Sequence, residues 1–339
     1  MLRSVVMTLA LSLAPGPAAV AHEWREVFSP DGTITQLYLP KQVDTAPSGL
    51  AALAADVTPL QQTGPSSQRF DLVFVGDGYT ASQQSLFVSH ATAKWNEVSA
   101  VEPFKKYKAY FNVWLVHVIS ASSGVDNDPT RGISRSTAMD MGFWCGGTER
   151  LLCVSQSKAL GFAANAPAVD QVMALANSTK YGGAGYTSGG LATASGGNAQ
   201  SGQVAIHEFG HSIGRLADEY FTAGRTYTGG EPTWINASKL TSAQMTAART
   251  KWYAYIGRPT PDGGVIGTFQ GANQYANGIY RPSDNSLMRS LGKPFNLVGL
   301  DAMDAAIAAK IVITAAPPDA PSWTDGSRDP AYAGGLRDR

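Results

Sequence analysis

Two histidines four residues apart constrain this chain more than any other feature of its sequence. His207 and His211 lie in the segment Gln203 to Ile213, whose apolar residues have the spacing of a buried α-helix. Helical residues are rotated by about 100° each, so positions four apart differ by only about 40° and both imidazoles face the same way. Two ring nitrogens on one face suit a single Zn²⁺ at about 2.0–2.1 Å from each. The sequence therefore predicts a helix that presents a metal ion.

Glu208 lies directly after the first histidine, in the run His207-Glu208-Phe209-Gly210-His211. Its side chain points away from the direction that the histidines share, so we expect it to reach a metal-bound water without binding the metal. Zn²⁺ lowers the pKa of its water toward about 7, and a carboxylate beside it can take the proton. Glu208 is therefore the candidate catalytic base.

The third metal ligand must be a residue other than a downstream histidine, because no histidine follows His211. The candidates are the carboxylates of Asp218 and Glu219. On a straight helix Asp218 would lie about 10 Å beyond His211, so the chain must turn. Gly214 stands where a left-handed C-cap would turn it. We favour Asp218 as the ligand and keep Glu219 as the alternative, and we expect the other carboxylate to accept a hydrogen bond from a histidine N–H.

The same region resembles known zinc enzymes. The run His207-Glu208-x-x-His211-x-x-Gly214 resembles the zinc helix of the metzincins, and the string from His211 to Tyr220 is similar to the bacterial IgA-peptidase family of zinc metallopeptidases. Further stretches carry the same likeness: Gly76 to Thr80, Lys180 to Gly183, and Tyr280 to Ser290. The likeness covers residues 71–305, which is most of the chain.

The resemblance implies an α/β (α+β) fold: a metzincin-like, two-lobed catalytic domain with a zinc-binding active-site helix and a small N-terminal β-rich segment. The upper lobe would provide an edge strand for the substrate, and the lower, irregular lobe would end in a helix over Asp301 to Ile313. One catalytic Zn²⁺ is the implied cofactor. The chain departs from the metzincin pattern at the third ligand, which that pattern places one residue earlier, where Ala217 stands.

Metzincins also place a methionine turn beneath the metal, and Met288 is the candidate for it. Such a methionine would form an apolar floor that does not bind the ion. A phenol or guanidinium can assist zinc in stabilising the oxyanion. By position Tyr280, Arg281 and Tyr220 are candidates, and we favour Tyr280 as the catalytic residue.

The sequence divides into four predicted segments: a signal peptide at 1–21, a β-hairpin segment and linker at 22–67, the catalytic domain at 68–315 and a C-terminal tail at 316–339. In the hairpin, strands within Trp24 to Leu39 flank a turn at residues 30–32. A strand, a helix and a strand are expected in succession at 70–75, 87–98 and 111–119. This order predicts a right-handed crossover in an α/β layer. The glycine-rich segment 181–202 is interpreted as a cleft rim, with flexible or edge-strand backbone as the alternative.

The first 21 residues predict export. Arg3 gives a positive start, residues 5–13 are apolar, and small residues at 19–21 form a cleavage pattern, with cleavage expected after Ala21. The apolar stretch is about half of the roughly 20 residues that span a bilayer. We therefore expect a secreted or periplasmic protein with no stable membrane span.

The two cysteines, Cys145 and Cys153, are expected to form a local disulfide in an oxidising compartment. The alternative is a pair of buried free thiols, and without a nearby histidine they make a poor zinc site. The formal net charge is zero, so the composition gives no reason to expect nucleic acid or an anionic membrane as a partner.

Together these features predict a secreted zinc-dependent endopeptidase that hydrolyses a protein or peptide substrate through a zinc-bound water activated by Glu208. One alternative is a zinc-containing surface-binding module or pseudoenzyme without hydrolytic activity. Another is a zinc amidase that acts on cell-wall peptides. No residue identifies the substrate, and cleavage of immunoglobulin A does not follow from a family name.

Overall fold

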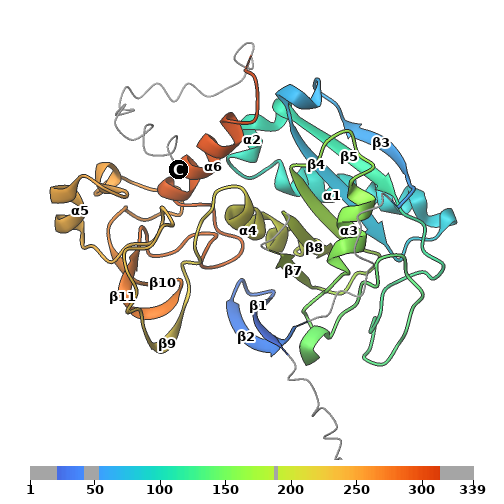
Figure 1. Ribbon diagram of the computed structural model, residues 1–339, viewed down its shortest axis with the longest axis horizontal. Coiled ribbons are helices and arrows are strands. Elements are labelled where there is room, and N and C mark those ends of the chain that lie inside the picture. Colours follow the sequence, from blue (N-terminus) through green and yellow to red (C-terminus); the bar gives the residue numbers. More distant parts are fainter. Residues whose placement is uncertain (1–20, 42–52, 187–189, 314–339) are drawn as a thin grey trace, which may run out of the picture.

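The computed structural model describes residues 21–41, 53–186 and 190–313, and these form a mixed α/β protein with three sheets and six α-helices (Figure 1). The helices are Gln84–Val98 (α1), Phe104–Tyr107 (α2), Gln156–Ala163 (α3), Gly202–Ser212 (α4), Ser242–Ala248 (α5) and Leu297–Ala308 (α6). The strands are His22–Phe28 (β1), Ile34–Pro40 (β2), Asp56–Gln61 (β3), Phe70–Asp77 (β4), Phe111–His117 (β5), Gln171–Ala176 (β6), Gly183–Tyr186 (β7), Leu191–Ser195 (β8), Phe221–Thr226 (β9), Phe269–Ala272 (β10) and Gln274–Arg281 (β11). Short 3₁₀ turns lie at Ser66–Gln68, Ala81–Gln83, Lys108–Tyr110, Cys145–Gly147 and Tyr253–Tyr255. The predicted signal peptide up to residue 20 and the predicted tail from residue 316 lie outside the described ranges.

A six-stranded sheet forms the larger part of the molecule, with the strand order β3-β5-β4-β6-β8-β7. The inner strands are parallel, whereas β3 and β7 pair antiparallel at the two edges. Helix α1 connects β4 to β5, as the strand–helix–strand pattern predicted. The edge strand β7 packs against α4, the helix that carries both histidines.

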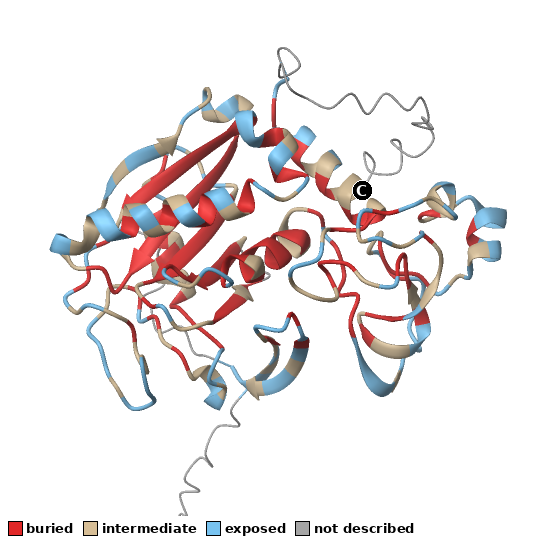
Figure 2. Cartoon of the chain, turned by 180° about the vertical axis from the view of Figure 1, so that it is seen from behind, coloured by how far each residue is buried: buried red, intermediate tan, exposed pale blue. Residues whose placement is uncertain are grey.

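Both faces of this sheet are covered, which is why β4 is a continuous buried run and not an alternating one. Leu72 and Phe74 pack in a core with α1, α4 and α6, whereas Val73 and Val75 pack in a second core on the side of α3. Figure 2 shows the buried central strands between partly exposed helices. The sheet therefore gives α4 a rigid support.

The segment expected to be a linker, 42–67, contains a strand. Residues 42–52 lie outside the described ranges, but β3 pairs antiparallel with β5 and forms one edge of the main sheet. An edge strand tolerates Pro59, because its outer side needs no backbone N–H for pairing. The small and polar residues of segment 42–67 are typical of a linker, so the sequence did not predict this strand.

After α4 the chain forms a smaller lobe on the other side of that helix, with a three-stranded sheet in the order β10-β11-β9 and helix α5 (Figure 1). Helix α6 then returns to the core of the larger lobe through Met303. The sequence placed this helix from Asp301, but it begins at Leu297. The Asn296 side chain caps it by accepting a hydrogen bond of 2.9 Å from the N–H of Gly299.

The N-terminal hairpin forms as predicted. Strands β1 and β2 pair antiparallel and turn through Gly32, which has a φ of +88°. In Figure 1 the hairpin lies beside β7 and below α4, and Phe28 packs against Val204 of that helix. A segment from the start of the described chain thus reaches the helix with the histidines.

Cys145 and Cys153 form the predicted disulfide, with their Cα atoms 5.9 Å apart. Among the described residues, no helix has both the length and the apolar character needed to cross a membrane.

Candidate metal centre

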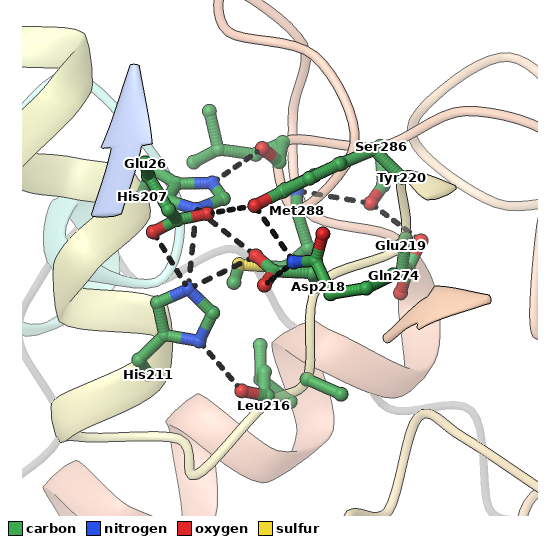
Figure 3. Close-up of polar contacts among 12 residues, drawn as sticks. Glu26, His207, His211, Leu216, Asp218, Glu219, Tyr220, Gln274, Ser286 and Met288 are labelled. Carbon is green, nitrogen blue, oxygen red and sulfur yellow. Dashed lines mark hydrogen bonds and ion pairs between the residues drawn. The ribbon is translucent and has the colours of Figure 1, made fainter. Parts of the chain in front are cut away.

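Four side chains converge beside α4. Glu26, His207, His211 and Asp218 each offer one ligand atom, and these atoms lie within 4.8 Å of one another (Figure 3). The histidines come from α4, Asp218 from the loop that follows it, and Glu26 from β1. Three separate parts of the fold therefore build one cluster.

Backbone carbonyls orient both imidazoles. His207 Nδ1 lies 3.0 Å from the carbonyl oxygen of Leu287, and His211 Nδ1 lies 2.7 Å from that of Leu216. A ring nitrogen that faces a carbonyl carries the proton, which leaves the lone pair on Nε2. The two Nε2 atoms face each other at 3.2 Å. Two lone pairs at this distance repel each other, and a proton or a metal ion between them relieves the repulsion.

The spacing of the cluster fits a tetrahedral zinc ion. Ligands about 2.0–2.1 Å from zinc lie roughly 3.3 Å apart in a tetrahedron. Asp218 Oδ1 is 3.2 Å from His211 Nε2 and 3.5 Å from His207 Nε2. This oxygen is buried and accepts no hydrogen bond. Two imidazoles and an unsatisfied carboxylate oxygen are a donor set that Zn²⁺ prefers.

The turn that brings Asp218 back to the histidines is made by Arg215, and the prediction of a left-handed Gly214 was wrong. Arg215 has a φ of +50°, whereas Gly214 is not among the residues with positive φ. Gly214 instead allows a close approach, because a Cβ there would lie 2.7 Å from Met303 Sδ. The Leu216 N–H then bonds the Gly210 carbonyl at 3.1 Å, which folds the chain back.

Gln274, which the sequence analysis missed, holds Asp218 in place. Its Nε2 donates to Asp218 Oδ2 and to the Tyr220 hydroxyl, both at 2.8 Å. Gln274 has a φ of +73°, a conformation that costs about 1–3 kcal/mol in a non-glycine residue and that clusters at functional sites. No sequence pattern marked it, because the glutamine arrives from β11.

Glu219 points away from the cluster. Its carboxylate accepts hydrogen bonds from Asn236, Ser286 and Asn296, and burial raises its pKa against their effect. The expectation that the second carboxylate would bind a histidine N–H was wrong, because backbone carbonyls take both of those protons. Glu219 instead ties the loop after α4 to the segment that contains Met288, whose carbonyl accepts from the Glu219 N–H at 2.7 Å.

In Figure 3 the Met288 side chain lies close to both histidines and to Asp218. It is 1% exposed. A Cβ on Gly210 of α4 would lie 2.5 Å from its sulfur, so the helix and the methionine are in tight contact. The preceding residue, Leu287, supplies the carbonyl that orients His207.

Glu208 lies on α4 against the edge strand. A Cβ on Gly185 of β7 would lie 1.8 Å from Glu208 Oε2, so only glycine leaves room for this carboxylate. Burial and the neighbouring Glu26 carboxylate raise the pKa of Glu208 to about 8. Glu208 Oε1 is buried and has no hydrogen-bond partner. The carboxylate therefore has an oxygen that can accept a proton.

The cluster concentrates negative charge around the imidazoles. Burial disfavours the charged form of His207, but the carboxylates of Glu26 and Asp218 outweigh this effect and raise its pKa to about 10. The same carboxylates, Asp218 foremost, raise the pKa of His211 well above its usual value against the effect of burial. The histidines in turn hold the pKa of Glu26 well below its usual value, although burial opposes this. The site thus favours a cation.

The phenol beside the cluster belongs to Tyr220, not to the favoured candidate Tyr280. Tyr280 lies on β11, where it pairs with Gln270 and Ser238. Among the described residues, the Tyr280 side chain makes no hydrogen bond to a member of the cluster. Tyr220 donates a hydrogen bond of 2.5 Å to Glu26 Oε1. Burial, with the nearby carboxylates, raises its pKa far above the usual value, so the phenol keeps its proton.

Glu26 is the member of the cluster that sequence reasoning missed. One signal was present: Trp24, Glu26 and Phe28 share a face of β1, and Phe28 on this face is buried. A carboxylate on a packed face needs a partner. The partner could not be named, because no local spacing connects the hairpin to α4.

The comparison with protein families supports a peptidase. A family model described as IgA Peptidase M64 matches residues 58–262 and 256–307. The matched residues include both histidines, Glu208 and Asp218 but not Glu26. A search of curated proteins found no match.

Proposed function

Because the chain belongs to the IgA peptidase M64 family, we propose that it is a zinc-dependent endopeptidase whose metal is held by His207, His211 and Asp218. Membership confirms the resemblance to the bacterial IgA-peptidase family and implies a protein or peptide substrate. The observation that carries the zinc proposal is the convergence of two oriented Nε2 atoms and an unsatisfied carboxylate oxygen at tetrahedral spacing. When bound, Zn²⁺ supplies Lewis acidity, which lowers the pKa of water toward about 7 and polarises the scissile carbonyl.

We propose Glu208 as the general base and acid. Burial is the largest cause of its raised pKa and makes this carboxylate a stronger base than an exposed one. Glu208 accepts a proton from the attacking water on its carboxylate and passes it to the leaving amine nitrogen. Gly185 sets the position of this carboxylate against β7.

We propose Tyr220 as the oxyanion donor in place of Tyr280. Its hydroxyl donates toward the oxygen of Glu26 nearest to His207, and Gln274 fixes the hydroxyl from the other side. A protonated phenol at this point can donate to the oxygen of a tetrahedral intermediate. Replacement of Tyr220 by phenylalanine is expected to lower kcat about 10²–10³-fold with little change in KM.

A metzincin-like arrangement is part of the proposal. Its support is the histidine helix α4, the turn at Arg215, the floor at Met288 and the antiparallel edge strand β7. We also propose export to an oxidising compartment, supported by the signal-like residues 1–21 and by the disulfide. N-terminal sequencing of protein from the medium or periplasm is expected to begin at His22.

A structural zinc site without catalysis is the second candidate, because Glu26 brings the number of protein ligands to four and structural sites are closed in this way. Glu208 argues against it. A buried carboxyl with an oxygen that lacks any partner contributes nothing to a purely structural site.

The test compares zinc content and casein hydrolysis in Glu208→Gln with those of the natural chain. Because the Glu26 carboxylate lies near the Nε2 atoms of His207 and His211, the comparison is also made in the Glu26→Gln background. Glu208→Gln is expected to keep one zinc per chain and lose hydrolysis in both backgrounds. The control is Glu149→Gln, since the Glu149 side chain is 56% exposed and pairs with Lys180. Hydrolysis that survives in Glu208→Gln, or that is absent from the Glu26→Gln background itself, contradicts the proposal.

A further inference from the structure

The N-terminal hairpin places a carboxylate in the metal centre. Glu26 Oε1 lies 3.6 Å from His207 Nε2, and Oε2 lies 3.7 Å from His211 Nε2. The Glu26 side chain is only 14% exposed, and the Tyr220 hydroxyl fixes its Oε1. Each distance is within about half an ångström of the roughly 3.3 Å edge of a zinc tetrahedron. Glu26 therefore stands where a fourth ligand would stand.

The same hairpin occupies the outer edge of β7. Arg25 Nη1 donates a hydrogen bond of 3.1 Å to the Gly185 carbonyl oxygen, and its guanidinium lies 4.6 Å from the centre of the Tyr186 ring. Extended peptides bind proteins by adding to the edge of a sheet through such carbonyls. Gly185 is also the residue against which Glu208 packs. A peptide that lies along β7 toward Glu208 must displace Arg25.

The hairpin is held by a small apolar cluster and by hydrogen bonds from residues outside the main sheet. Arg150 donates to the Phe28 carbonyl oxygen and to the Ser29 hydroxyl, and the Leu291 N–H donates to the Gly32 carbonyl oxygen. Phe28 and Ile34 are buried together with Val204 of α4 and with Tyr220. The edge of the Phe28 ring meets the His207 ring, with centroids 5.5 Å apart. These contacts position β1 over the histidines. Because β1 and β2 form a two-stranded sheet of their own, departure of the hairpin breaks no strand pairing of the main sheet.

We infer that Glu26 is a fourth protein ligand to the metal and that the hairpin, residues 22–40, is an inhibitory segment that must leave before a substrate enters. The inference rests on the proposed zinc endopeptidase function. A catalytic zinc keeps one open position, and four protein ligands close it. Glu26 closes the metal while Arg25 covers the sheet edge. The family match begins at residue 58, so the hairpin lies outside the region that matches a peptidase.

The test measures access to the metal. Zinc-loaded natural chain, Glu26→Gln and the control Glu102→Gln are titrated with acetohydroxamate, a small bidentate zinc ligand, by calorimetry. We expect Glu26→Gln to bind it on the order of tenfold more tightly or better, and to bind zinc about 10–100-fold more weakly in competition with a chromophoric chelator. Glu102 is exposed and its carboxylate accepts a hydrogen bond from the Lys106 N–H, which a glutamine oxygen can also accept, so Glu102→Gln is expected to match the natural chain.

A second variant keeps Glu26 and weakens the hairpin. Arg25→Ala removes the hydrogen bond to Gly185 and is expected to raise both acetohydroxamate binding and casein hydrolysis above those of the natural chain. If the natural chain binds acetohydroxamate as tightly as Glu26→Gln does, the inference is overturned while the zinc endopeptidase stands. If His211→Ala leaves the zinc content unchanged, the proposed function fails and the inference fails with it.

Discussion

Gly185 sets the position of the proposed catalytic carboxylate. A Cβ at this residue would lie 1.8 Å from Glu208 Oε2 and 1.9 Å from Cδ. Gly185 is not among the glycines with positive φ, so the backbone accepts alanine and only the Glu208 side chain must move. Ordinary contact begins at 3.4 Å, which requires the carboxylate to shift by about 1.6 Å.

Such a shift has a measurable cost in rate. A displacement of about 1 Å lowers the rate of an oriented reaction on the order of 100-fold, so Gly185→Ala is expected to lose at least about 100-fold in kcat/KM for casein. Zinc content and thermal stability are expected to be unchanged, and the assay uses the Glu26→Gln background. The control is Gly230→Ala, because no atom lies within 4 Å of its Cβ. Full activity in Gly185→Ala would refute the placement of Glu208 beside the reacting water.

Three other changes have expected outcomes. Glu219→Ala removes the acceptor of two asparagine side chains and a serine hydroxyl, all of them buried. Urea denaturation is expected to show a loss of about 3–5 kcal/mol in the free energy of unfolding. A loss under about 1 kcal/mol would contradict a stabilising role for these hydrogen bonds. Cys145→Ser opens a loop of eight residues and is expected to cost about 2.5 kcal/mol in the same assay, whereas an unchanged stability would mean that the bond constrains nothing. In the metal-free protein the pKa of His207 is raised from 6.5 to about 10, so its contribution to stability is complete below about pH 6.5 and is lost as the pH rises toward 10. Denaturation of the chelator-treated protein across this range is expected to show that fall, and a rise in stability would count against the carboxylate-rich site.

The helix that carries His207 and His211 could be predicted because its signal is local. The spacing of His207 and His211 fixes their common direction once the segment is helical. Asp218 followed by elimination among the residues downstream. The turn between His211 and Asp218 was predicted less well. The left-handed residue is Arg215, whereas the neighbouring Gly214 is required for packing against α6.

The residues that only the tertiary structure brings to the site could not be predicted from the sequence. Glu26 and Gln274 come from β1 and β11, and no spacing relates either strand to α4. The choice between Tyr280 and Tyr220 as the catalytic phenol could not be made from local spacing either, because it depends on how the chain runs after Asp218. Strand β3 was missed because its composition is that of a loop, and pairing with β5 decides its structure.

X-ray absorption at the zinc edge tests most directly whether these side chains hold one catalytic zinc. For the natural chain we predict one zinc per chain, two imidazole nitrogens and carboxylate oxygens at about 2.0–2.2 Å, and no sulfur. In Glu26→Gln the contribution of the two imidazoles to the spectrum is expected to persist, while one carboxylate is lost from the zinc ligands. A spectrum without two imidazoles, or a zinc content unaffected by His211→Ala, would contradict the assignment of His207, His211 and Asp218 as the metal site.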